Sequence, residues 1–194
     1  MKQMICIHPR KAVWAMRDFL NEISTLEYII EADYNGEEME NAVKAKRMAK
    51  IIKGDTFCAY VYGIYGQFEE YYKIAYNWDS LWDRANYYFR KNFVSRCPSA
   101  QGFASITLTL LHELGHIQTE HNNYSIPERN AEESRIRALY RNKQINYEVL
   151  QTLYFNIPQE YDATNWAIEW LKDPAHRKIA KKFEKQFFAC FAAV

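Results

Sequence analysis

Residues 99–121 read SAQGFASITLTLLHELGHIQTEH, and this stretch decides how the rest of the chain is interpreted. Its apolar residues recur at helical spacing, so we expect one helix with the motif His-Glu-Leu-Gly-His, residues 112–116, in its middle. On a helix, His112 and His116 lie one turn apart on the same face, and both imidazoles can reach one metal ion. Glu113 projects to one side, where it can take a proton from a metal-bound water that acts as nucleophile. The stretch therefore predicts a metal-dependent hydrolase with Glu113 as its general base.

Zinc is the metal that this motif favours. Zinc binds imidazole and carboxylate ligands, lowers the pKa of a bound water to about 7 and polarises a carbonyl group as a Lewis acid. This chemistry hydrolyses peptide bonds, so we expect a zinc metallopeptidase with one zinc ion per chain. The alternative is two ordinary histidines on a helix surface. Against it, three of the five histidines fall between positions 112 and 121, and Gly115 costs a helix about 1 kcal/mol relative to alanine. A small residue at position 115 would let another chain segment approach.

The third zinc ligand is expected to be a glutamate from a later helix. A third histidine would require His-x-x-Gly-x-x-His, but Thr119 occupies the glycine position and His121 comes too late. The spacing leaves several glutamates open as the ligand, namely Glu128, Glu132, Glu133 and Glu160, with Glu148 a more distant choice. Most of these must be solvated helix carboxylates. Glu128 follows Pro127 at a predicted helix start, where a carboxylate is favourable without any metal.

Residues 160–171 read EYDATNWAIEWL, with Pro174 just beyond, and this stretch resembles the second signature of ImmA/IrrE-like metallopeptidases. Members of that family pair a His-Glu-x-x-His helix with a later helix of the form Glu-x-x-Ala, then aromatic-Ala, a Leu-rich end and a proline. The resemblance spans about residues 104–174 and implies that Glu160 completes the zinc site of His112 and His116. It also implies a regulatory role, such as cleavage of a repressor.

The chain departs from the family's pattern in three places. The interval between the two motifs is long for the family, and we expect it to hold extra helices at residues 128–140 and 145–155. Position 164 is threonine where the family usually has asparagine or aspartate, so the resemblance predicts an altered hydrogen-bond partner for a metal ligand. The first ninety residues match nothing in the family.

The N-terminal half predicts two helices followed by a small sheet. Helical spacing of apolar residues indicates a helix over residues 9–30, and a second helical pattern with a basic face covers residues 37–53. Aromatic runs at 57–65 and 68–76 alternate as in an antiparallel hairpin, and residues 86–90 could add a third strand.

These elements predict an α+β fold, in which a small antiparallel sheet packs on the active-site helix of a mostly helical, zincin-like domain. We expect a single domain over residues 1–194. It has N-terminal helices in 1–54, the sheet in 55–95, and the zinc-binding and C-terminal helices in 99–194.

Composition limits the partners. A formal net charge of +1 creates no field that would attract nucleic acid or a membrane surface, so the expected partner is a protein or peptide substrate. Four scattered cysteines and no signal-peptide pattern indicate a cytoplasmic protein. The alternative function is a non-catalytic, zinc-stabilised protein-interaction module, which a closed site with four protein ligands would favour.

Overall fold

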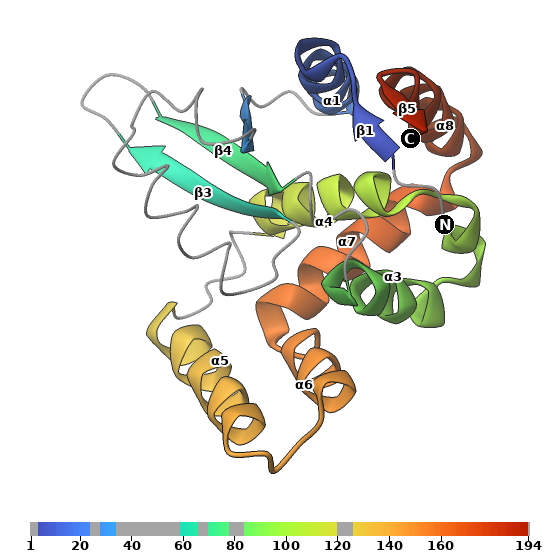
Figure 1. The fold of residues 1–194 in the computed structure, drawn as a ribbon. Coiled ribbons are helices and arrows are strands. Elements are labelled where there is room, and N and C mark those ends of the chain that lie inside the picture. The colour runs from blue at the N-terminus through green and yellow to red at the C-terminus, as the bar shows by residue number, and fades with distance from the viewer. Residues whose placement is uncertain are drawn as a thin grey trace.

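The computed structural model describes residues 4–23, 28–33, 59–65, 70–77, 84–119 and 126–193 (Figure 1). Most of these residues lie in helices. The helices are α1 (Pro9–Ile23), α3 (Arg84–Arg96), α4 (Ser105–Thr119), α5 (Ile126–Arg141), α6 (Tyr147–Tyr154), α7 (Pro158–Lys172) and α8 (Pro174–Phe188), with a short 3-10 helix, η2 (Pro98–Gly102), before α4. The strands are β1 (Met4–Cys6), β2 (Tyr28–Asp33), β3 (Ala59–Tyr65), β4 (Glu70–Asn77) and β5 (Phe191–Ala193).

The longer strands form a mixed sheet in the order β2-β4-β3. β3 and β4 are antiparallel, with Ala59 opposite Tyr76 and Tyr65 opposite Glu70, as expected for the aromatic hairpin. β2 joins the other side of β4 in parallel, with Tyr28 opposite Tyr72. β1 and β5 pair separately and bring the two ends of the described chain together.

The predicted α+β class with an antiparallel sheet is wrong, because helices dominate the described residues and the sheet contains a parallel pair. The helix predicted over residues 9–30 ends at Ile23, and residues 28–33 form β2. Their apolar residues are consecutive and two are β-branched isoleucines, which favours a strand. Residues 86–90 lie in α3, not in a third strand, because Phe89 and Phe93 are buried on one helical face. The helix expected at 37–53 lies outside the described residues.

The C-terminal half follows its predicted pattern. Helices α5 and α6 occupy the long interval between the two motifs, and α7 and α8 both begin at prolines. Within the described ranges, no helix is both long and apolar enough to cross a membrane.

Helix α4 forms the centre of the core. Every residue from 106 to 115 is buried, which is the pattern of a helix covered on all sides. It packs most extensively against α7 and also contacts α3, α8 and β3 (Figure 1). Aromatic residues extend the core to α1, where Phe19 stacks on Phe183 of α8 with ring centroids 4.5 Å apart.

Polar contacts fix the start of α4. The buried Glu184 of α8 accepts hydrogen bonds from the Ala104 backbone N–H and, at 2.8 Å, from the Thr107 hydroxyl. A carboxylate at this end of a helix also faces the positive end of the helix dipole. Lys181 balances the charge of Glu184 at 2.6 Å. These contacts orient the helix that carries His112 and His116.

Gly115 sets the distance between α4 and α7. A Cβ atom at this position would lie 2.3 Å from the Ala163 backbone oxygen, far inside van der Waals contact. The prediction that a small residue here admits another segment is therefore confirmed, and α7 is that segment.

Replacing Gly115 with alanine should force the two helices apart. We expect Gly115→Ala to lower the free energy of unfolding by about 1–3 kcal/mol, as overpacking does, despite alanine's better helix propensity. Urea unfolding followed by circular dichroism measures this change. Gly102→Ala is the matched control, because nothing lies within 4 Å of a Cβ atom there. Equal stability of the two variants would contradict the close-approach explanation.

Candidate metal centre

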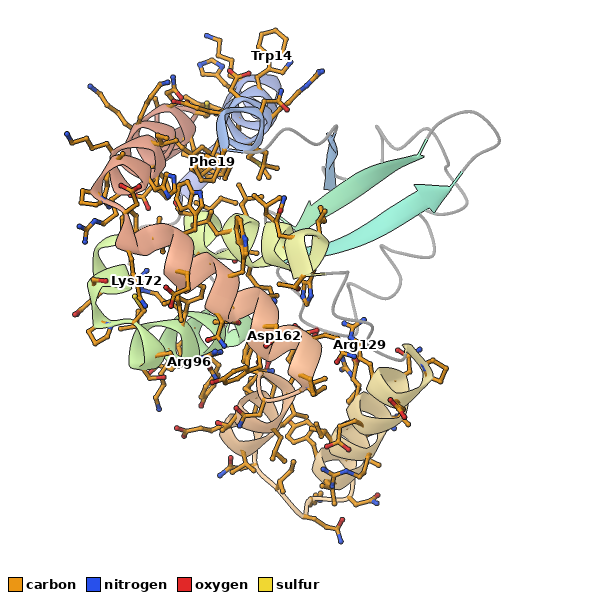
Figure 2. The ribbon with its side chains drawn as sticks, turned by 180° about the vertical axis from the view of Figure 1, so that it is seen from behind. Trp14, Phe19, Arg96, Arg129, Asp162 and Lys172 are labelled. Carbon is orange, nitrogen blue, oxygen red and sulfur yellow. The ribbon has the colours of Figure 1, made fainter. Side chains whose placement is uncertain are left out.

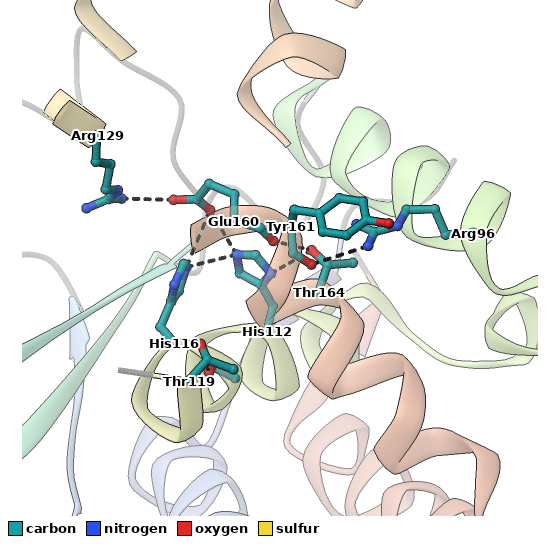
Figure 3. Close-up of polar contacts among 9 residues, drawn as sticks. Arg96, His112, His116, Thr119, Arg129, Glu160, Tyr161 and Thr164 are labelled. Carbon is teal, nitrogen blue, oxygen red and sulfur yellow. Dashed lines mark hydrogen bonds and ion pairs between the residues drawn. The ribbon is translucent and has the colours of Figure 1, made fainter. Parts of the chain in front are cut away.

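Two histidines of α4 and one glutamate of α7 point at one another (Figure 3). The Nε2 atoms of His112 and His116 are 3.2 Å apart. Oε2 of Glu160 lies 3.1 Å from the first of these atoms and 3.4 Å from the second. The histidines meet because they are one turn apart on α4, and Glu160 reaches them because it lies in the first turn of α7, three residues before Ala163. This arrangement can hold a metal ion.

The group is shielded from solvent. Glu160 is 1% exposed and His112 is 3% exposed, while His116 is partly buried. Phe89 and Phe155 pack their rings against His112 with centroids 5.4 Å and 6.2 Å away. A low-dielectric surrounding of this kind strengthens every charge interaction within the group.

Burial and charge act in opposite directions on these side chains. Burial alone would raise the pKa of the Glu160 carboxyl, but the neighbouring imidazoles, His116 first, outweigh it and hold this pKa well below its usual value. Burial alone would lower the pKa of His116, but the Glu160 carboxylate outweighs it, so this pKa is raised. Glu160 is therefore ionised, and His116 is more basic than usual. A metal cation that binds here would displace a proton from the imidazole of His116.

Glu113 is buried next to this group, at 5% exposure. Burial raises the pKa of its carboxyl, and the imidazoles of His116 and His112 offset part of the shift. No hydrogen bond joins its carboxylate to another described residue. Glu113 has the properties that a general base at this position needs.

Thr164 fixes which nitrogen of His112 faces the other ligands. The Thr164 hydroxyl donates its single proton to the Glu160 backbone oxygen at 2.8 Å, so it accepts from Nδ1–H of His112 at 3.1 Å. The lone pair of His112 then lies on Nε2, toward Glu160 and His116. Thr164 is therefore the hydrogen-bond partner of His112, at the position where the family usually has asparagine or aspartate.

The other glutamates that the spacing left open lie elsewhere. Glu132 pairs with Arg135 on α5, and the half-buried Glu133 pairs with Arg137. Glu148 on α6 pairs with Lys91 at the surface, and Glu128 is exposed. None of these four residues belongs to the described group that could hold a metal. His121 is not among the described residues.

Two residues near the group carried no signal in the sequence. Arg129 of α5 donates from Nη2 to Oε1 of Glu160 at 2.8 Å. Tyr154, at the end of α6, has the pKa of its hydroxyl raised well above the usual value by burial and then by the Glu160 carboxylate. Both come from the helices that fill the interval between the two motifs, so only the folded chain brings them to the site.

Comparison with protein-family models, with curated proteins and with solved structures found no match. The resemblance to ImmA/IrrE-like metallopeptidases consequently rests on the residues of the two motifs alone.

Loss of the Thr164 hydroxyl should weaken metal binding. We expect Thr164→Val to raise the Kd for zinc by about 10- to 100-fold, because the orientation and tautomer of His112 are no longer fixed. Thr164→Ser should restore most of the affinity. Competition with a chromogenic chelator measures these values.

Thr152→Val is the control for that experiment. Like Thr164, Thr152 donates its hydroxyl proton to the backbone oxygen four residues earlier, here that of Glu148. Thr152 is exposed on α6, away from the metal group. An unchanged zinc affinity in Thr164→Val would show that His112 does not depend on this contact.

Proposed function

We propose that the protein is a zinc-dependent peptidase that hydrolyses a peptide bond in a protein substrate, with His112, His116 and Glu160 as zinc ligands and Glu113 as general base. The observation that carries this proposal is the meeting of two imidazole nitrogens and one carboxylate oxygen at 3.1–3.4 Å in a buried place. Two histidines and one glutamate are a ligand set of catalytic zinc, which keeps a further position for water or substrate. When bound, zinc would supply a Lewis acid and an activated water.

The chain's own residues divide the remaining work. Glu113 takes up a proton from the water that attacks the substrate carbonyl, and then passes this proton to the leaving amine. Its buried carboxyl, with a raised pKa and no hydrogen bond in the described chain, suits both steps. Thr164 keeps Nε2 of His112 directed at the ligand group.

The setting of the reaction is also a proposal. The resemblance of residues 160–171 favours regulatory cleavage of a repressor over general proteolysis. We place the protein in the cytoplasm, because Cys97 and Cys190 are both buried as free thiols in the described structure.

Glu113→Gln tests the function directly. Glutamine keeps the shape of the side chain but cannot accept the proton, so we expect unchanged zinc content and a fall in kcat of about 10²- to 10⁴-fold on a candidate repressor substrate. Metal analysis and a cleavage assay give the two values. Treatment of the wild-type protein with a chelator should abolish cleavage, and added zinc should restore it.

Glu169→Gln is the matched control, since Glu169 is exposed on α7 and pairs only at the surface, with Lys172. This control should retain full activity. Full activity in Glu113→Gln would remove Glu113 from the mechanism. A wild-type protein that binds zinc and cleaves no substrate would instead support the non-catalytic interaction module.

A further inference from the structure

The two carboxylate oxygens of Glu160 have different partners (Figure 3). Oε2 faces both imidazoles, at 3.1 Å from His112 and 3.4 Å from His116. Oε1 turns away from them and accepts the 2.8 Å hydrogen bond from Nη2 of Arg129. One oxygen is thus directed at the ligand group, and the other is already occupied.

Arg129 reaches Glu160 from a different part of the fold. It lies on α5, a helix whose main packing partner is α6, and it extends toward α7 (Figure 2). Its Nε atom is buried and has no hydrogen-bond partner among the described residues, and burying an unpaired donor costs free energy. The contact with the buried carboxylate offsets that cost, which indicates that the position of Arg129 is specific.

The charges around the ligands make this arginine significant. Glu160 and Glu113 place two carboxylates in a buried region, and Arg129 is within electrostatic reach of both. An arginine stays protonated in proteins, so its charge does not depend on whether a metal is present. A permanent cation bound to Oε1 draws negative charge away from Oε2.

We propose that Arg129 is a positioning residue, which holds Oε1 of Glu160 so that this ligand offers the metal only one oxygen. The proposal rests on the zinc site described above. A carboxylate that binds through one oxygen leaves a coordination position for water or substrate, whereas a carboxylate that binds through both would fill it. Reduced charge on Oε2 also leaves the ion a stronger Lewis acid.

Cobalt(II) in place of zinc tests this role without an activity assay, because its visible spectrum reports the number of ligands. The full chain is prepared as wild type, Arg129→Gln, Arg129→Lys and the control Arg135→Gln. Arg135 lies on the same helix and forms a solvent-exposed ion pair with Glu132. Arg135→Gln therefore also removes an arginine–glutamate pair, but one that is away from the metal group. Each protein is titrated with cobalt(II), and zinc affinity is measured by chelator competition.

We expect Arg129→Gln to bind zinc more tightly than the wild type, because a positive charge near the metal is removed and Oε1 becomes a second ligand atom. Its cobalt spectrum should weaken toward that of a higher coordination number, because Oε1 is released to the metal. Arg129→Lys keeps the positive charge and should give intermediate values, and Arg135→Gln should match the wild type. Circular dichroism identifies a variant that has failed to fold, and Arg129→Lys then carries the comparison.

The outcomes separate this role from the site itself. Cobalt binding by the wild-type protein with an identical spectrum in Arg129→Gln would overturn the role of Arg129 and leave the metal site intact. A purely structural role would change stability and leave the spectrum of bound cobalt unchanged. Absence of cobalt and zinc binding by the wild-type protein would overturn both the metal site and the role of Arg129.

Discussion

The close approach of α4 and α7 at Gly115 is the constraint on which the rest of the structure depends. The backbone oxygen of Ala163 occupies the space that a side chain at position 115 would need. This contact brings the first turn of α7 to the histidine-bearing face of α4, and Glu160 and Thr164 lie on either side of Ala163 in the sequence. The same helix crossing therefore supplies a carboxylate for the ligand group and a hydroxyl for Nδ1 of His112.

The site is a balance of buried charges that extends beyond the three ligands. Glu160 is ionised because imidazoles oppose the effect of its burial, whereas burial dominates at Glu113 and raises the pKa of its carboxyl. Neighbouring carboxylates with opposite shifts suit different tasks, one as a permanent ligand and one as a group that exchanges a proton. Arg129 adds a positive charge beside Glu160, through the hydrogen bond from its Nη2 to Oε1.

Local patterns predicted the site better than they predicted the sheet. The spacing of His112 and His116 and the glycine at position 115 act within one helix, so the sequence was sufficient for them. Glu160 followed from a resemblance, since several glutamates fit the spacing equally well. Arg129 was not foreseen, because its contact with α7 exists only after α5 and α6 have folded. Residues 28–30 and 86–90 were assigned wrongly because short aromatic and β-branched runs suit a helix or a strand according to what they pack against.

X-ray absorption at the zinc edge of the purified protein tests the central claim most directly. The account predicts one zinc ion with two imidazole nitrogens at about 2.0 Å and oxygen ligands at about 2.0–2.2 Å, and loss of one oxygen ligand in Glu160→Ala. Sulfur ligands at about 2.3 Å, a spectrum unchanged in Glu160→Ala, or a protein free of zinc after reconstitution would contradict it.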